Sequence, residues 1–390
     1  MTRTRLLGLA IILAALSCSW PGSARAGYIL VDLGVLDGGS GSSGAGINAA
    51  GLVAGTGQNA LGLDRAIRAG GGGPPSDLTT LPGGRFSSAA AINRDGLVVG
   101  SSELQVTPFQ FQVHAFLSAS PGSIADLGVL PNSVESHATG INDGGLVVGF
   151  GVIANPTGFG ALTRAIIIPP GGTPAELGTF AGGNNSRADG VNASGVAVGS
   201  ADNASGVFHA FRTNSSGRLE DLGGLPGGTG SSFGLGINDG GRVVGRGGVS
   251  GGFEAFRSRS DGTLELLGFV KGTTSSSANA INNAGTVVGS SSFSSGASLA
   301  FLYSDLTGIV DLNTLIPSNS GWVLNSAGGI NDAGQISGTA TVNGQARGFR
   351  LDPRTMAVPE PSPLALAAVG LVGLLARVVW SARARGRVRP

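Results

Sequence analysis

Short apolar runs alternate with polar and glycine positions along most of this chain. The segment GINDGGLVVG, which begins at Gly140, holds two apolar runs on either side of a polar bend. Near-copies begin at Ala91, Gly190, Gly236 and Ala280. Asn-x-x-Gly between two apolar runs predicts a β-hairpin, because Asn bonds the backbone two residues on and Gly supplies a positive φ.

The hairpin belongs to a longer repeat that occurs seven times. Its turn asparagine recurs every 44 to 50 residues, at Asn48, Asn93, Asn142, Asn192, Asn238, Asn282 and Asn331. A DLG-like phrase begins at Asp32, Asp77, Asp126, Glu176, Asp221, Leu266 and Asp311. A HAF-like phrase is centred on Ala66, Ala115, Ala165, Ala210, Ala255, Ala300 and Gly348.

The spacing of these phrases predicts four short strands per repeat. The step from the HAF position to the next DLG position is always eleven residues, and most of the length variation falls between VVG and HAF. Constant segments set geometry, whereas variable ones are surface loops. Four strands in about 47 residues indicate a propeller blade. We therefore predict an all-β, seven-bladed β-propeller over residues 27–357, with a β-solenoid as the alternative fold.

The two ends of the repeat region are out of phase, which predicts how the ring closes. The chain begins with a spare DLG-type strand, Tyr28–Leu36, and ends after the third strand of the seventh copy, Ala346–Asp352. Pairing these two segments antiparallel would complete the seventh blade and satisfy its edge hydrogen bonds.

Residues 1–26 read as a secretory signal peptide. Arg3 and Arg5 precede an apolar stretch, Leu6–Leu16, that is too short to span a bilayer comfortably. Small residues Ala24 and Ala26 mark a cleavage site before Gly27. The alternative is an N-terminal membrane anchor.

Residues 358–390 carry a second targeting signal. Pro359-Glu360-Pro361 leads into an apolar segment, Leu364–Trp380, which predicts a single C-terminal transmembrane helix. An arginine-rich tail follows, with Arg383, Arg385 and Arg387 on the cytoplasmic side by the positive-inside rule.

This order of Pro-Glu-Pro, apolar segment and arginine tail resembles the PEP-CTERM sorting signal of Gram-negative, exopolysaccharide-producing bacteria. The resemblance implies recognition by an exosortase and cleavage near Pro-Glu-Pro, so that membrane attachment through the helix is temporary. The alternative is a permanent single-pass anchor.

The repeats also resemble the extracellular HAF-repeat family. The phrase is HAF at His114–Phe116 and His209–Phe211, and departs to RAI at Arg65 and Arg164. The family is defined by its repeats, and the resemblance implies no particular activity.

Composition narrows the choice of function. Of the 24 Lys and Arg residues, eight are arginines of the two terminal segments, which leaves 16 basic residues against the 23 acidic residues of the whole chain. The body contains one lysine, Lys271, so nucleic acid is an unsuitable partner. The only cysteine, Cys18, lies in the signal peptide, so we expect no disulfide and no thiolate metal site.

Candidate chemistry is sparse. The acidic residues of the DLG phrases could form a ring that binds cations or sugar, but we favour a role accepting backbone hydrogen bonds at strand starts. The turns at Asn142-Asp143 and Asn238-Asp239 supply too few oxygens for calcium. His114 and His209 occupy equivalent repeat positions, which indicates structural roles, whereas His137, near Glu135, is the histidine least dictated by the repeat. We expect no cofactor and no catalytic residues.

These observations predict a secreted, exosortase-sorted cell-surface protein, a structural or binding component associated with exopolysaccharide or another surface glycan. The variable loops between VVG and HAF are the segments we expect to carry binding. The alternatives are a glycan-active surface enzyme, in which paired carboxylates in the propeller channel would do the chemistry, and a calcium-dependent adhesin.

Overall fold

A computed structural model describes residues 27–354, except 71, 121, 156, 157 and 159. The described residues up to Pro353 form one compact unit. The predicted signal peptide, sorting signal and C-terminal helix lie outside the described residues. Within the described part of the chain, no helix is long and apolar enough to cross a membrane.

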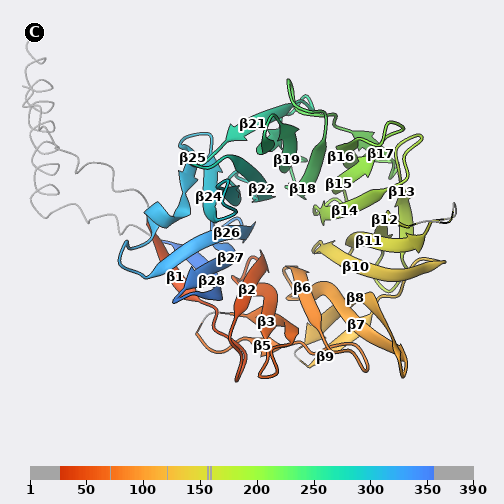
Figure 1. Cartoon of the computed structure of the whole chain (residues 1–390), viewed down its shortest axis with the longest axis horizontal. Coiled ribbons are helices and arrows are strands. Elements are labelled where there is room, and N and C mark those ends of the chain that lie inside the picture. The colour runs from red at the N-terminus through yellow and green to blue at the C-terminus, as the bar shows by residue number, and fades with distance from the viewer. Residues whose placement is uncertain (1–26, 71, 121, 156–157, 159, 355–390) are drawn as a thin grey trace, which may run out of the picture. The chain divides into compact units, whose positions relative to one another are not determined.

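The described residues form seven four-stranded antiparallel sheets arranged around a central axis (Figure 1). Blade 1 contains β2 (Ser42–Ile47), β3 (Val53–Gln58), β4 (Asp64–Ala69) and β5 (Ser76–Asp77). Blade 2 contains β6 (Ser87–Ile92), β7 (Val98–Thr107), β8 (Gln110–Ser120) and β9 (Ser123–Asp126). Blade 3 contains β10 (Ser133–Ile141), β11 (Val147–Ala154), β12 (Ala161–Ile168) and β13 (Ala175–Gly178).

The remaining blades repeat this order from the axis outward. Blade 4 contains β14 (Ser186–Val191), β15 (Ala197–Asp202), β16 (Phe208–Thr213) and β17 (Leu219–Asp221). Blade 5 contains β18 (Ser232–Ile237), β19 (Val243–Val249), β20 (Gly252–Ser258) and β21 (Leu264–Gly268). Blade 6 contains β22 (Ser275–Ile281), β23 (Val287–Ser292), β24 (Ser298–Ser304) and β25 (Gly308–Asp311), followed by the short 3₁₀ helix η1 (Leu312–Leu315).

Blade 7 combines both ends of the propeller. It contains β26 (Trp322–Ile330), β27 (Ile336–Val342) and β28 (Gln345–Pro353), and its fourth strand is β1 (Tyr28–Asp32). β1 pairs antiparallel with β28, from Tyr28 opposite Pro353 to Asp32 opposite Phe349. The predicted propeller and its closure by the N-terminal strand are therefore confirmed, and the solenoid alternative is wrong.

The closing strand is shorter than the predicted Tyr28–Leu36. It ends at Asp32, whose Oδ1 accepts a hydrogen bond from the N–H of Gly34 at 2.8 Å. Gly34 has a φ of +76°, which takes the chain out of the extended conformation.

The repeated apolar residues form the core between neighbouring sheets. The phenylalanines of the HAF phrase are fully buried in five blades, at Phe116, Phe211, Phe256, Phe301 and Phe349. Ile67 and Ile166 take the equivalent buried position in blades 1 and 3. The HAF phrase is therefore a packing motif: its aromatic or branched residue fills the space between two blades.

The glycine of each VVG phrase allows the two innermost strands to approach closely. A Cβ on Gly149 would lie 1.8 Å from the carbonyl oxygen of His137 on the neighbouring strand. The same clash, at 1.9 to 2.1 Å, would arise at the six equivalent glycines, Gly55, Gly100, Gly199, Gly245, Gly289 and Gly338. Glycine is required here by the approach of another backbone.

Candidate functional site

The seven repeat asparagines form a closed ring around one end of the channel. The Nδ2 of each donates to the backbone carbonyl of the next repeat asparagine at 2.9 to 3.2 Å, and Asn331 donates to Asn48 to close the circle. We call these seven residues the asparagine ring. The ring surrounds a hollow of about 450 Å³.

The same asparagines form the predicted turns, with one correction. The glycine three residues on has φ between +75° and +82° in every copy, as predicted. Oδ1, however, accepts from the N–H of the residue four positions on in all seven copies, and only Asn48 also accepts from two positions on. The side chain thus spans the whole hairpin turn.

A second tier of bonds lies beside the ring, at the position after each asparagine. The carboxylate of Asp143 accepts from the N–H of Arg94 at 2.8 Å, and that of Asp239 accepts from the N–H of Ala193 at 2.9 Å. Asn283 donates through Nδ2 to both Asp239 and Asp332. These carboxylates accept hydrogen bonds from the neighbouring blade. No group of three or more His, Cys, Asp and Glu residues that could hold a metal occurs among the described residues.

The acidic residues of the DLG phrases lie on the outermost strands and do not form a ring at the channel. Asp77, Asp126 and Asp221 each end their strand by accepting a bond from the backbone N–H two residues on. The preferred backbone-accepting role is therefore seen, but at strand ends rather than strand starts, because the DLG phrase continues into a turn.

The first residue of the HAF phrase pairs with the same carboxylates. The histidine Nδ1 lies 2.9 Å from a carboxylate oxygen both between His114 and Asp126 and between His209 and Asp221. Arginine takes the histidine position in the pairs Arg65–Asp77 and Arg164–Glu176. Both predicted structural histidines thus fasten the outer hairpin of a blade.

His137 lies elsewhere, on the innermost strand of blade 3. It occupies the position five residues before the repeat asparagine, about 16 Å along the strand from the ring. The seven copies carry different residues at this position: Ser43, Ser88, His137, Arg187, Phe233, Ser277 and Ser326. Large functional side chains therefore occur only in blades 3, 4 and 5.

The contacts of blades 3 and 4 at this end form a continuous stack. The His137 ring is parallel to the Phe150 ring at a centroid distance of 4.5 Å, and the Arg187 guanidinium lies 4.4 Å from the same Phe150 centroid. Two groups this close to one ring must cover its opposite faces. Arg187 also donates from Nε to Asp189 Oδ1 at 2.6 Å, and His137 Nε2 lies 3.5 Å from Glu135 Oε2.

Blade 5 continues the cluster. Arg246, directly opposite Phe233 on the next strand, lies over the Phe233 ring at 5.5 Å and over the Phe253 ring at 4.8 Å. Phe233 stacks on Phe208 of blade 4 at 5.9 Å. We call the set His137, Phe150, Arg187, Phe233, Arg246 and Phe253 the arginine–aromatic cluster.

Burial changes the protonation of two residues here. Asp189 lines the channel interior, and its burial raises the pKa of its carboxyl, although Arg187 and Arg246 act to lower it. Desolvation lowers the pKa of His137, as does the charge of Arg187, against the opposing effect of Glu135. His137 is accordingly a neutral imidazole at neutral pH.

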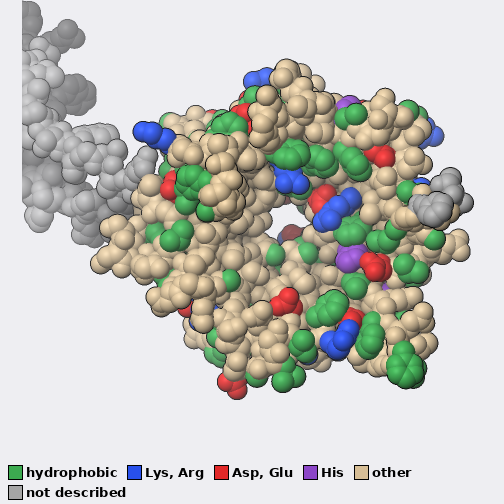
Figure 2. Space-filling view, in the orientation of Figure 1, with side chains coloured by type: hydrophobic (Ala, Val, Ile, Leu, Met, Phe, Trp, Pro, Cys, Tyr) green, Lys and Arg blue, Asp and Glu red, His purple; other side chains and the backbone are tan. Residues whose placement is uncertain are grey.

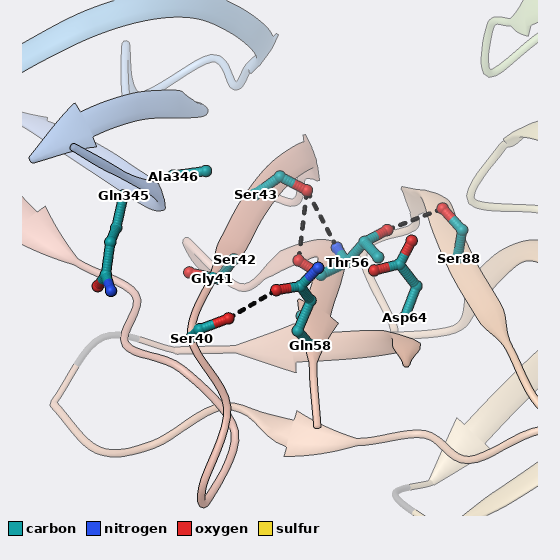
Figure 3. A pocket seen from close by; sticks show the side chains of 11 residues that line it. Ser40, Gly41, Ser42, Ser43, Thr56, Gln58, Asp64, Ser88, Gln345 and Ala346 are labelled. Atoms are coloured by element: carbon teal, nitrogen blue, oxygen red, sulfur yellow. Dashed lines mark hydrogen bonds between the residues drawn. The ribbon is translucent and has the colours of Figure 1, made fainter. Parts of the chain in front are cut away.

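Blades 1, 2 and 7 line a hollow at the end of the channel where blades 3, 4 and 5 have large side chains. It has a volume of about 530 Å³ and is lined by hydroxyl and amide groups, including Ser43, Thr56, Gln58 and Ser88, and by the carboxylate of Asp64 (Figure 3). Ser40 Oγ donates to Gln58 Oε1 at 2.7 Å, and Thr56 and Ser88 share a hydrogen bond at 2.8 Å. Figure 2 shows charged, histidine and hydrophobic side chains gathered around part of the central opening, and mostly small polar surface elsewhere on its rim.

Most of the arginine–aromatic cluster was missed by the sequence analysis. His137 was singled out, but Arg187, Phe233 and Arg246 were not. An alignment of the seven copies could have found it. At the position five residues before the asparagine, four copies have serine and three have the large side chains of His137, Arg187 and Phe233. The predicted cleavage-site residues Ala24 and Ala26 and all the sorting-signal residues lie outside the described part of the chain.

Comparison with known proteins yields similarity in structure only. No family model and no curated protein matches the sequence. Puromycin hydrolase has a TM-score of 0.49 at 14% identity, over 77% of this chain and 50% of that one. The propeller domain of the Trilobed protease from Pyrococcus furiosus has a TM-score of 0.44 at 10% identity, over 70% and 86%. TolB from Acinetobacter baumannii has a TM-score of 0.35 at 12% identity, over 67% and 70%.

The chain spans half the length of the puromycin hydrolase chain that it matches. The similar structures include both hydrolytic proteins and TolB. A propeller fold by itself does not distinguish an enzyme from a non-enzyme.

Proposed function

We propose that this chain is a secreted, exosortase-sorted surface protein whose propeller binds an extracellular glycan. Binding takes place at the channel end that carries the arginine–aromatic cluster and the neighbouring polar hollow. The variable loops between the second and third strands of each blade reach this same end, because the second strand of each blade runs away from the asparagine ring.

One observation carries the binding proposal: the repeat symmetry is broken on one arc of the channel entrance. Residues that build the fold recur in all or nearly all copies, as the ring asparagines and the VVG glycines do. The fold does not require a large side chain at the repeat position of His137, Arg187 and Phe233, because four copies have serine there. Aromatic faces with a few oriented polar groups are typical of ligand-binding surfaces.

A glycan array probed with the recombinant body, residues 27–357, tests the binding proposal. We expect retention of a subset of glycans, lost when His137, Arg187 and Phe233 are all replaced by serine, the residue of the other four blades. The triple variant should remain folded, because serine already occupies this position elsewhere in the ring. An array on which the body and the variant bind alike would contradict the proposal.

The sorting proposal is supported by Pro359-Glu360-Pro361, the following apolar segment and the arginine tail. Deletion of Leu364–Pro390 should divert the protein from the cell envelope to the periplasm or the medium, as measured by fractionation and immunoblotting. Detection of the arginine tail on mature, surface-exposed protein would show that the processing step does not occur.

A second candidate function, a glycan-active enzyme, has one observation in its favour. His137 and Asp189 both have shifted pKa values and lie on neighbouring blades beside the channel. Shifted pKa values in a cleft are common in active sites. Release of reducing ends or unsaturated sugars from a polysaccharide by the purified protein, abolished in His137→Gln, would favour the enzyme over the binding protein.

A further inference from the structure

We infer that the arginine–aromatic cluster recognises a carboxylated saccharide, with the sugar carboxylate bound by Arg246 and Arg187. This inference rests on the proposed glycan-binding function and specifies its ligand class. It draws on the free hydrogen-bond donors of the two arginines, on the rings that orient them, and on the polar hollow at the same end of the channel.

Arg246 offers an unoccupied cationic group. It is exposed, and within the described part of the chain its guanidinium makes no hydrogen bond and no salt bridge, although its charge acts on the carboxyl of Asp189. Arginines of the outer hairpins differ: Arg164 pairs with Glu176 and Arg212 with Glu220. Two phenylalanine rings hold the Arg246 guanidinium instead, which restricts its motion without using its N–H donors.

Arg187 offers a second set of donors on the adjacent blade. Its Nε bonds to Asp189, its two terminal nitrogens make no hydrogen bond within the described part of the chain, and its side chain remains 47% exposed. Phe150 holds the guanidinium plane in the same way as the phenylalanines hold Arg246. Both arginines act on the carboxyl of Asp189, which identifies that residue as their common neighbour.

The donor geometry favours a carboxylate. A guanidinium presents a planar fork of N–H groups that matches the two oxygens of a carboxylate, and such charge-assisted pairs are about twice as strong as neutral hydrogen bonds. The hollow of blades 1, 2 and 7, across the ring from the two arginines, is lined by Ser43, Thr56, Gln58, Asp64 and Ser88, which offer donors and acceptors suited to sugar hydroxyls. Both features lie at the same end of the channel.

Nucleic acid fits the cluster less well. Base stacking requires an open aromatic face, and both faces of Phe150 are covered, by His137 and Arg187. Phosphate binding also depends on clustered Lys and Arg, whereas residues 27–357 have 16 basic residues against 22 acidic ones. The cluster therefore suits a single carboxylate beside a sugar better than a polyphosphate backbone.

The test measures binding of the full chain, purified in a non-ionic detergent, to three polymers: polygalacturonate, the same polymer with its carboxylates reduced to alcohols, and dextran. We expect binding to polygalacturonate that weakens with added salt, and on the order of tenfold weaker binding in Arg246→Gln, as for loss of one charge-assisted pair. Arg218→Gln is the matched control, because Arg218 is exposed, has no carboxylate partner among the described residues, and lies in the β16–β17 turn at the asparagine end.

The possible results distinguish failure of the carboxylate inference from failure of the proposed glycan-binding function. Equal binding of the native and carboxyl-reduced polymers, unchanged in Arg246→Gln, overturns the carboxylate inference and leaves glycan binding intact. Binding to none of these polymers and to no glycan on an array overturns both. Tighter binding of a sulfated glycan or of a single-stranded oligonucleotide than of polygalacturonate overturns the ligand class. Arg246 makes no hydrogen bond within the described protein, so the variant should fold, and its melting temperature verifies this.

Discussion

The amide of each repeat asparagine is divided between two bonds. Its oxygen accepts from the hairpin of its own blade, and its nitrogen donates to the next blade. The asparagine is buried, so loss of its side chain leaves the hairpin N–H without a partner and removes one of the two bonds to the carbonyl of the next blade, which still accepts from the glycine of its own turn. This double use favours asparagine in all seven copies: an amide carries its donor and its acceptor on two separate atoms, whereas ionised aspartate has no donor and serine has a single oxygen for both roles.

Asn238→Ala should lower the free energy of unfolding by about 2 to 3 kcal/mol, as measured by urea denaturation, because two buried bonds are lost. Asn203→Ala is the control. Asn203 also accepts two backbone N–H bonds in a hairpin turn, but it makes no bond to another blade within the described residues. Its loss should cost about 1 kcal/mol or less. Equal losses in the two variants would mean that the ring bond contributes nothing.

Asp189 should make the stability of the propeller depend on pH. Burial raises the pKa of its carboxyl in the folded state, so the folded protein holds this proton more tightly than the unfolded chain does. The stabilisation from this group is complete below the unfolded pKa and is lost as pH rises through the folded pKa.

Asp189→Asn removes this titration while keeping a polar side chain. The melting temperature of the variant relative to the wild type should therefore rise between about pH 4 and about pH 8. Loss of the Asp189 bond to Arg187 changes the melting temperature of the variant by an amount that varies less with pH. The diagnostic quantity is therefore the slope, against pH, of the difference in melting temperature between variant and wild type. A difference that stays flat or falls with pH would show that the carboxyl is not destabilised by burial.

The innermost strand of each blade is fastened to the preceding blade near its start. Ser136 Oγ accepts from the N–H of Ala115 at 2.9 Å and donates to the carbonyl of Gly128 at 2.6 Å. A buried serine makes this pair of contacts in six blades, at Ser42, Ser87, Ser136, Ser186, Ser232 and Ser276. Hydrogen bonds between blades therefore exist at both ends of the inner strands.

Ser136→Ala should cost about 2 to 4 kcal/mol of stability, since a buried N–H and a partly buried carbonyl lose their partner together. Thermal unfolding of the variant measures this loss. Ser194→Ala, in an exposed hairpin turn, should change stability by less than about 0.5 kcal/mol. If the two serines prove equivalent, the link between blades is not a source of stability.

The closed ring joins the two ends of the propeller sequence. β1 supplies the outer strand of blade 7, and β2 of blade 1 lies beside β26 of blade 7 (Figure 1). Side chains reinforce this junction: Ser42 Oγ accepts from Gly348 N–H at 3.0 Å, and Arg350 donates to the carbonyls of Gly51 and Gly70. Every blade therefore has two neighbours, in contrast to the end units of an open array.

Removal of Tyr28–Asp32 should destabilise the whole propeller by more than about 3 kcal/mol, because it exposes the edge of β28 and opens the ring. The measurement is the midpoint of denaturant unfolding, with loss of a single cooperative transition as the more severe form of the same result. Ile29→Ser is the control, since this side chain is 52% exposed while its backbone stays paired. A deletion that behaves like this substitution would show that β1 does not hold the ring closed.

Local and periodic features were predictable from the amino-acid order. The hairpin turns depend on Asn and Gly within five residues, and the blade number depends on counting copies. Closure by Tyr28–Asp32 was predictable because the spare strand and the missing strand belong to one repeating cycle. Each of these inferences uses spacing along the chain, which the sequence contains in full.

Contacts between blades were not predictable in this way. The asparagine nitrogen bonds a residue 44 to 50 positions away along the chain, or 283 positions away at the closure, and nothing in the local pattern identifies that partner. The stacking of Arg187 on Phe150 is of the same kind. Such contacts depend on how far each twisted sheet rotates against the next, which is set by the packing of buried side chains between the sheets. The candidate site is built from these contacts, so its composition could be read from the chain, but its assembly required the folded ring.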